Sequence, residues 1–167
     1  MCIRDSTYAF DDEGVSTKKK VVVENGVLKT YLHNLKSAKL MHTTSTGNGF
    51  KSGYRGNVGI SPTNFYIEAG NETYDNMIAS MKKGIIIDDI SGLHAGINTV
   101  STEFSIQSSG FYVEDGKIVK PVNLITIAGN FLEMMKQVQA VGSDLTFSLS
   151  GVGTPSILFS SLSVSGE

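Results

Sequence analysis

Two short stretches of the chain each place a turn-forming dipeptide between β-forming residues. The first is "KKKVVVENGVLKTYL", whose turn is Asn25-Gly26, and the second is "FYVEDGKIVKPV", whose turn is Asp115-Gly116. Both central residues of a type I′ turn need a positive φ, so Asn-Gly and Asp-Gly are the pairs that favour it. The sequence therefore predicts two antiparallel hairpins, one in each half of the chain.

Three other segments are predicted to be short helices, because each starts at a capping residue and repeats apolar side chains at helical spacing. They are residues 34–42, capped by Asn34, residues 71–84, capped by Asn71 or Thr73 and stopped by Gly84, and residues 130–139, capped by Asn130.

Most of the remaining chain has the composition of strands. In "TEFSIQS" the apolar residues Phe104 and Ile106 alternate with polar residues, which is typical of a sheet with one solvent-exposed face. The predicted fold class is therefore α+β: mainly antiparallel β-sheet, barrel-like or sandwich-like, with about three short flanking helices.

Composition limits the classes of partner. The chain has 167 residues, 40% of them apolar, and a net charge of -2. No apolar run approaches the roughly 18 residues of a membrane-spanning helix, and no concentrated basic face is available for a nucleic acid. The single cysteine, Cys2, excludes an internal disulfide. We expect a protein of a reducing compartment that binds neither membranes nor DNA.

Residue types that carry chemistry are sparse. No pair among His33, His42 and His94 has the i, i+4 spacing that brings two imidazoles to one helix face for zinc. No G-x-S-x-G elbow marks a nucleophilic serine. A hydrolase that depends on His94 in "GLHAGIN" is a minor alternative, because no partner for that histidine is visible.

The glycine-rich segment "STGNGFKSGYRGN" is the main candidate for binding. Its glycines allow backbone N–H groups to approach an anion, and two basic residues supply charge. It departs from a P-loop because Phe50 stands before Lys51. We expect either a plain connector or a loop that lines a substrate cleft; the residues of that cleft would be Gly47, Asn48, Gly49, Lys51, Arg55 and His94.

Three adjacent acidic residues, Asp11, Asp12 and Glu13, precede the first hairpin. With no histidine or cysteine beside them, they are predicted to form a polar turn that ends at Gly14 rather than a metal or acid–base site. Their side chains would accept hydrogen bonds from nearby backbone N–H groups.

The stretch "FDDEGVSTKKKVVVENGVLKTYL" resembles the carboxyl-terminal domain of the TldD/PmbA family, which is named both for modulation of DNA gyrase and for peptide processing. The likeness continues through "SAKLMHTTSTGNG", "TNFYIEAGNETYDNMIASMKKGIIID" and "GVGTPSILFSSLSVSG". We expect residues 8–167 to be a TldD/PmbA-like carboxyl-terminal domain. Residues 1–7 fit nothing in the pattern and are expected to be a foreign or disordered leader, in place of a missing amino-terminal domain.

The resemblance implies a cytoplasmic zinc metallopeptidase system of two related subunits that processes small or unfolded peptides. In the catalytic type, an H-E-x-x-x-H helix of the amino-terminal domain and a cysteine of a late loop hold the zinc, and a fourth position is left for water. Here the late loop is "SGVGTPSILF", which has no cysteine, and H-E-x-x-x-H is absent. The chain thus looks like the PmbA (TldE) type, the non-catalytic partner.

These implications define the expected roles. The chain itself is expected to have no catalytic residue, metal ligand or cofactor, with zinc only in a related TldD-type partner subunit, and its substrate is a peptide. The alternative is a regulatory or binding protein that acts on DNA gyrase or another protein without proteolysis.

Overall fold

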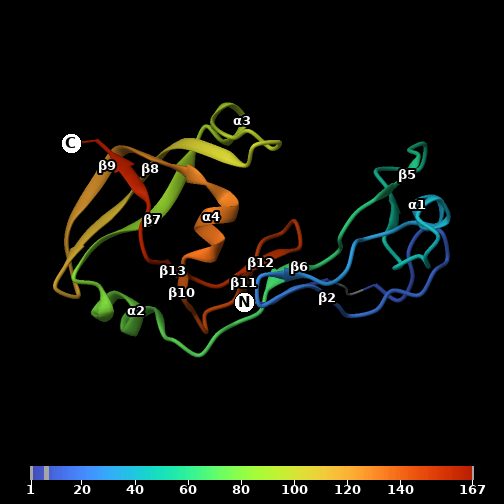
Figure 1. Cartoon of the computed structure of the whole chain (residues 1–167), viewed down its shortest axis with the longest axis horizontal. Coiled ribbons are helices and arrows are strands. Elements are labelled where there is room, and N and C mark those ends of the chain that lie inside the picture. Colours follow the sequence, from blue (N-terminus) through green and yellow to red (C-terminus); the bar gives the residue numbers. More distant parts are fainter. Residues whose placement is uncertain (1, 6–7, 167) are drawn as a thin grey trace. The chain divides into compact units, whose positions relative to one another are not determined.

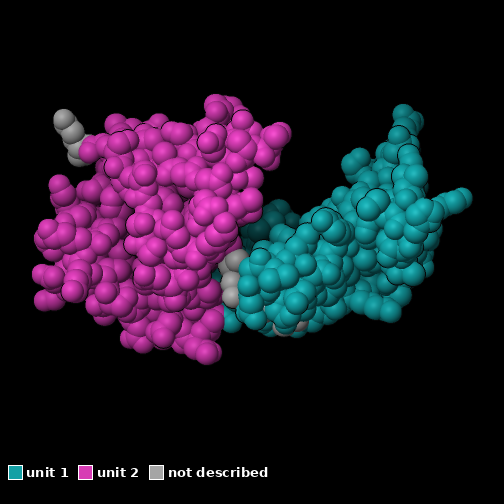
Figure 2. All heavy atoms as spheres, viewed as in Figure 1, with its two compact units in different colours: residues 1–69, 145–155 teal, residues 70–144, 156–167 magenta. Residues whose placement is uncertain are grey.

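The computed structural model describes residues 2–5 and 8–166 and divides the chain into two units (Figures 1 and 2). Unit 1 comprises Met1–Ala69 and Leu145–Pro155, and unit 2 comprises Gly70–Asp144 and Ser156–Glu167. Each unit is therefore assembled from two separate stretches of sequence. Local pattern did not predict this division, because it depends on contacts between residues far apart in the chain.

Unit 1 contains a six-stranded sheet in the order β11-β12-β6-β1-β2-β3. Neighbouring strands are antiparallel, except that β12 and β6 run parallel. The strands are β1 (Cys2–Asp5), β2 (Lys20–Glu24), β3 (Val27–Leu28), β6 (Phe65–Ile67), β11 (Thr146–Phe147) and β12 (Val152–Thr154).

Strand β1 belongs to the segment for which a leader was expected. It pairs with β2 and β6, and so forms an ordered part of the sheet. Residues 1, 6 and 7 of the same segment lie outside the described residues. The origin of the segment stays a prediction.

Three further elements complete unit 1 beside this sheet. Helix α1 (Leu35–Leu40) starts at the N-cap Asn34, as predicted. Strands β4 (Gly49–Lys51) and β5 (Val58–Ile60) form a separate antiparallel pair. The glycine-rich segment is thus a β-hairpin in part, whereas the sequence pattern predicted a loop there.

Unit 2 is built on a four-stranded antiparallel sheet in the order β14-β9-β8-β7. A second pair, β10 with β13, is also antiparallel. The strands are β7 (Lys83–Ser91), β8 (Glu103–Glu114), β9 (Lys117–Asn130), β10 (Val138–Val141), β13 (Ile157–Phe159) and β14 (Ser163–Ser165). Its helices are α2 (Tyr74–Ser80), α3 (Leu93–Gly96) and α4 (Phe131–Lys136).

Both predicted hairpins are confirmed. Asn25 and Gly26 connect β2 to β3 with φ of 50° and 78°, and Asp115 and Gly116 connect β8 to β9 with φ of 49° and 73°. All four residues adopt the left-handed backbone that a type I′ turn requires.

The predicted helix over residues 71–84 is shorter than expected. Thr73 caps α2 through its side chain, but the helix ends at Ser80, and Gly84 lies inside β7. The reason is tertiary, since the amides of the Asp115-Gly116 turn donate hydrogen bonds to the carbonyl oxygens of Lys82 and Met81 at 2.7 and 2.8 Å. The predicted cap of α4, Asn130, is confirmed, and the four-residue α3 was not predicted.

The two units differ in what they bury. Unit 2 buries mainly apolar side chains, Met77, Ile106, Val113, Ile125 and Ile127, with Ser108 as a buried polar residue. In unit 1, the buried apolar residues Val22 and Ala38 are accompanied by four buried polar ones, Asp5, Asp11, Asn34 and Asn48. Hydrogen bonds between buried polar side chains therefore contribute more to holding the interior of unit 1 together than that of unit 2.

The predicted fold class is confirmed: mainly antiparallel sheets with few short helices make an α+β protein. Among the described residues, no helix has the length and apolar character needed to cross a membrane.

Candidate functional site

The acidic turn, defined as residues 11–14, closes on its own backbone. The Asp11 Oδ1 atom accepts hydrogen bonds from the amides of Glu13 at 3.0 Å and Val15 at 2.9 Å. Gly14 has a φ of 77°, in the region where glycine has no Cβ to strain. The predicted polar turn ending at Gly14 is confirmed.

The carboxylates of the acidic turn also bind strand β4. Asp11 Oδ2 accepts a hydrogen bond from the amide of Gly49 at 2.9 Å, and Asp12 Oδ2 accepts one from the amide of Lys51 at 2.8 Å. The amide of Asp12 donates in return to the carbonyl of Gly49 at 2.9 Å. Since β5 pairs with β4, the acidic turn holds the β4–β5 hairpin in place.

Two glycines permit this close approach. A Cβ atom on Gly49 would lie 2.4 Å from Glu13 Oε2, the atom that accepts a hydrogen bond from the amide of Leu35 at 2.7 Å. Gly47 has a φ of 70°, and a Cβ there would lie 2.8 Å from the carbonyl oxygen of Ser16. The glycines of this segment therefore serve backbone packing against the acidic turn and its flank.

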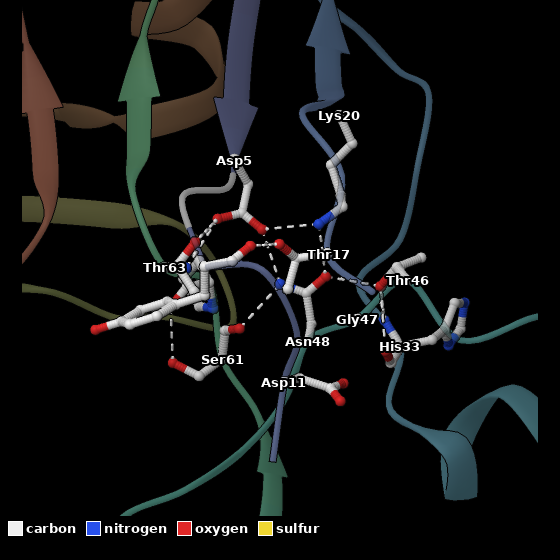
Figure 3. A network of polar contacts seen from close by, with 12 residues as sticks. Asp5, Asp11, Thr17, Lys20, His33, Thr46, Gly47, Asn48, Ser61 and Thr63 are labelled. Atoms are coloured by element: carbon white, nitrogen blue, oxygen red, sulfur yellow. Dashed lines mark hydrogen bonds and ion pairs between the residues drawn. The ribbon is translucent and has the colours of Figure 1, made fainter. Parts of the chain in front are cut away.

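Between these glycines, Asn48 lies at the centre of a buried polar network (Figure 3). Its Nδ2 atom donates to Asp5 Oδ2 at 2.8 Å and to the carbonyl of Ser61 at 3.0 Å. Its Oδ1 atom accepts from Lys20 Nζ at 3.1 Å and from Thr46 Oγ1 at 2.7 Å. The amide group of Asn48 thus has a partner on both of its atoms.

The buried carboxylate of Asp5 is also fully engaged. Lys20 Nζ lies 3.2 Å from its Oδ2, and Thr63 donates to its Oδ1 from the backbone at 2.8 Å and from the hydroxyl at 3.1 Å. A buried charge that is paired and hydrogen-bonded in this way is tolerated, whereas an unpaired one is costly. The network is structural, since its members bind one another.

The residues predicted to line a cleft are distributed between the two units. Gly47, Asn48, Gly49 and Lys51 lie together in unit 1, and Arg55 lies beyond β4 with its guanidinium 5.0 Å from the centre of the Tyr54 ring. His94 belongs to α3 of unit 2, so it is not part of this hairpin. A cleft-lining role for these residues stays a prediction.

A hollow of about 560 Å³ opens beside the acidic turn in unit 1. We call it the aromatic hollow. Its lining consists of Tyr8, Phe10, Phe50 and Pro62, of the acidic residues Asp11 and Asp12, and of Thr63 and Ser150. The rings of Tyr8 and Phe50 are tilted by 50° with their centres 5.8 Å apart.

The sequence reasoning did not predict this hollow, although the sequence contains one signal that could have indicated part of it. Tyr8 and Phe10 are two positions apart immediately before the acidic turn, a spacing that places both side chains on one face of an extended chain. Phe50 comes from β4, 40 positions later by number, so only folding brings the three rings together.

The amino-acid sequence matches the model of a known protein family. The family described as "PmbA/TldA metallopeptidase C-terminal domain" matches residues 4–166. The chain belongs to the PmbA/TldD metallopeptidase family. The match covers nearly the whole chain and corresponds to the carboxyl-terminal domain of such proteins.

Relatives with two different names resemble this PmbA/TldD chain. A metalloprotease TldD homolog of Buchnera aphidicola is 35% identical and matches 94% of this chain and 35% of its own length. A metalloprotease PmbA homolog of Haemophilus influenzae is 37% identical and matches 98% of this chain and 34% of its own length. The chain spans about a third of the length of these curated relatives. Because the chain is about equally identical to relatives of both names, these identities do not distinguish the TldD type from the PmbA type.

Two solved structures share the fold of this PmbA/TldD chain. TldE from Thermococcus kodakarensis has a TM-score of 0.91 at 28% identity, over 99% of this chain and 39% of that one. A candidate modulator of a DNA gyrase from Thermotoga maritima has a TM-score of 0.88 at 40% identity, over 98% of this chain and 39% of that one.

The metallopeptidase name raises the question of whether this PmbA/TldD chain carries ligands for zinc. Within residues 2–5 and 8–166, no three side chains of histidine, cysteine, aspartate or glutamate gather so as to hold a metal ion. The Nδ1 atom of His33 lies 3.2 Å from Ser37 Oγ, and the carboxylates of the acidic turn accept backbone N–H groups. The Cys2 side chain lies outside the description. The described donors do not fit a zinc site of three protein ligands.

Proposed function

We propose that the chain is the carboxyl-terminal domain of a PmbA-type subunit, which guides small or unfolded peptides in a zinc metallopeptidase complex without cleaving them itself. The observation that carries the proposal is the inventory of donors. Residues 150–159, which correspond to the late loop that carries a cysteine in the catalytic type, contain no histidine, cysteine, aspartate or glutamate. Zinc and the cleaving step then belong to a related TldD-type subunit.

Two comparisons support the proposal. Relatives named TldD and relatives named PmbA both match this chain, as expected for two related kinds of subunit. The fold is also that of a protein named TldE, with a TM-score of 0.91. Because the chain spans about a third of its curated relatives, the proposal concerns the larger assembly in which such a domain works.

The test is reconstitution with a TldD-type subunit. The purified chain is mixed with that subunit, and cleavage of an unfolded peptide is followed together with the mass of the complex. We expect a stable complex and cleavage at least several times faster than with the TldD-type subunit alone. A matched control carries Gln in place of the glutamate of the H-E-x-x-x-H motif in the TldD-type subunit, and it should bind the chain without cleaving. No complex and an unchanged rate would exclude the proposal.

A second candidate function is favoured by one comparison. The Thermotoga maritima protein that is 40% identical to this chain is named as a candidate modulator of a DNA gyrase. If this chain acts in that way, it should change the rate of supercoiling by purified gyrase in the absence of any TldD-type subunit. An unchanged rate of supercoiling, together with faster peptide cleavage in the reconstitution with a TldD-type subunit, selects the peptidase role.

A further inference from the structure

The aromatic hollow presents ring faces and edges to solvent. Tyr8 and Phe10 keep 64% and 66% of their surface exposed. Tyr8 nevertheless lies against the ring of Phe50, and Phe10 lines the hollow next to the acidic turn. Large rings left this exposed within a concave surface are typical of a binding site. A volume of about 560 Å³ exceeds that of any single side chain and suits a short part of a ligand.

The charge of the hollow has one sign. Among the described lining residues, Asp11 and Asp12 are acidic and none is basic. Asp11 is 2% exposed and is held by three backbone amides, whereas Asp12 is exposed and accepts from the amide of Lys51. The ion pairs described in unit 1 join Lys20 to Asp5 and Lys29 to Glu24, so neither carboxylate of the hollow is neutralised by one of them.

Rings and carboxylates together select a cation. The face of an aromatic ring attracts a guanidinium or ammonium group, and a carboxylate beside it adds a charge-assisted hydrogen bond. The acidic turn is also held rigidly by its hydrogen bonds to β4, so little ordering is left to occur on binding.

We infer that the aromatic hollow binds the cationic side chain of an arginine or lysine in an extended peptide. Tyr8, Phe10 and Phe50 contact the apolar stem and the charged head, and the Asp12 carboxylate pairs with that head. The inference rests on the proposed function: if the chain guides peptides, this hollow would make peptides with basic side chains its substrate class. Its test needs neither a sister subunit nor cleavage, so its failure and the failure of the proposed assembly are distinguishable.

The experiment compares two probes of nearly equal shape on the unmodified chain. N-acetyl-arginine amide carries the guanidinium, and N-acetyl-citrulline amide replaces it with a neutral urea; acetylation removes the amino-terminal charge from both. Binding is measured by chemical-shift titration of backbone amides. We expect arginine to bind roughly fivefold more tightly than citrulline, with shifts at residues of the hollow, and the preference to shrink in high salt. Equal affinities would overturn the inference.

Three variants locate the preference. Asp12→Asn keeps an acceptor for the amide of Lys51 but removes the charge, and Phe10→Leu keeps an apolar side chain but removes the ring. Each should bring the preference for arginine to less than about twofold. The control Asp75→Asn removes an acidic residue of α2 in unit 2 and should leave the preference intact. A preference that survives both variants of the hollow would place the site elsewhere and refute the inference; should Asp12→Asn not fold, Phe10→Leu and the probe comparison decide.

Discussion

At the scale of the residue, Asn48 illustrates how a polar side chain can serve as part of a protein interior. It is 0% exposed, and its amide makes four hydrogen bonds to groups from β1, β2 and two loops. Each of these groups would be left without that partner if the amide were removed, and the cost of an unsatisfied buried group exceeds the net gain from a satisfied one.

Replacing Asn48 by Leu should therefore destabilise the protein strongly. The two side chains have the same number of heavy atoms and similar branching, so the loss reports mainly the hydrogen bonds to Asp5, Lys20 and the other partners, together with the cost of fitting the bulkier methyl groups. We expect the free energy of unfolding to fall by about 3 kcal/mol. Urea denaturation followed by circular dichroism measures it. Asn57→Leu at an exposed position of the same segment is the control, with an expected change within about 0.5 kcal/mol. A loss below about 1 kcal/mol for Asn48→Leu would contradict this account of the network.

Ser108 presents the opposite case. It is 3% exposed in β8, and its hydroxyl has no hydrogen-bond partner among the described residues. Ser108→Ala should leave stability unchanged or raise it by up to about 1 kcal/mol, because an unpaired hydroxyl is removed from the interior. Exposed Ser105→Ala in the same strand is the control for strand propensity. Thermal unfolding compares the two, and a clear loss specific to Ser108→Ala would show that the hydroxyl has a bound partner such as water.

Asp144 makes stability depend on pH. The hydroxyl and then the amide of Ser156 donate to its carboxylate, at 2.6 and 3.0 Å, and these bonds lower the pKa of Asp144 below its ordinary value. A lowered folded pKa means that the stabilisation is present above the unfolded pKa of about 3.9 and is lost as the pH falls through the folded pKa.

Ser156→Ala removes the main cause of this shift. Because Asp144 is exposed, we expect the variant to lose only a few tenths of a kcal/mol at pH 7. The gap between variant and parent should close progressively below about pH 4, as the carboxylate is protonated in both states. Urea denaturation at a series of pH values measures this gap. A gap that is constant down to pH 2.5 would show that the charge of Asp144 is not involved.

At the scale of the element, the two type I′ turns share their chemistry and differ in their surroundings. Gly26 and Gly116 both have a positive φ. A Cβ atom on Gly26 would meet nothing within 4 Å, whereas one on Gly116 would lie 2.9 Å from the carbonyl oxygen and 3.0 Å from Cα of Ala79 in α2. The second turn is therefore also a packing contact between a hairpin and a helix.

The pair of substitutions Gly26→Ala and Gly116→Ala separates these two effects. Gly26→Ala should cost about 1 kcal/mol, the strain of a left-handed backbone. Gly116→Ala should cost at least about 1 kcal/mol more, because backbone atoms of α2 must move. Equal losses of stability in urea would mean that the contact with Ala79 yields without cost.

At the scale of the whole molecule, the two units differ in what stabilises them. Apolar residues such as Val113 and Ile125 are buried in unit 2, whereas polar residues such as Asp5 and Asn48 are fully buried in unit 1. Hydrogen exchange of the native protein reports the free energy of opening of each region separately.

We expect the Asn48→Leu substitution to affect the units unequally. Amides in the pairing of β4 with β5 should exchange at least tenfold faster, whereas amides in the pairing of β8 with β9 should change much less. Measurement by mass spectrometry or NMR distinguishes this outcome from an equal acceleration in both units. Equal acceleration would mean that the two units open as one.

Several features were predictable because their causes are local. The dipeptides Asn25-Gly26 and Asp115-Gly116 predicted both hairpins, and the caps Asn34 and Asn130 predicted the starts of α1 and α4. Each of these signals acts within about four residues, so it is visible in the sequence.

The errors have long-range causes. Helix α2 stops at Ser80 because its following residues pair with the second hairpin turn, and the glycine-rich segment becomes β4 because the acidic turn binds its backbone. The aromatic hollow joins Tyr8 and Phe10 to Phe50 and Ser150, which no local pattern connects. Predicting any of these required knowing which distant segments meet.

The amino-acid sequence by itself determined the α+β class, the hairpin turns, the helix caps and the resemblance to the PmbA/TldD family, since these depend on short-range backbone preferences and on the order of motifs. Only the tertiary structure decided that the acidic turn organises β4, that Asn48 and Asp5 are buried together, and that three rings and two carboxylates share one hollow. Burial and proximity are properties of residues separated by tens of positions, and the folded chain alone brings them together.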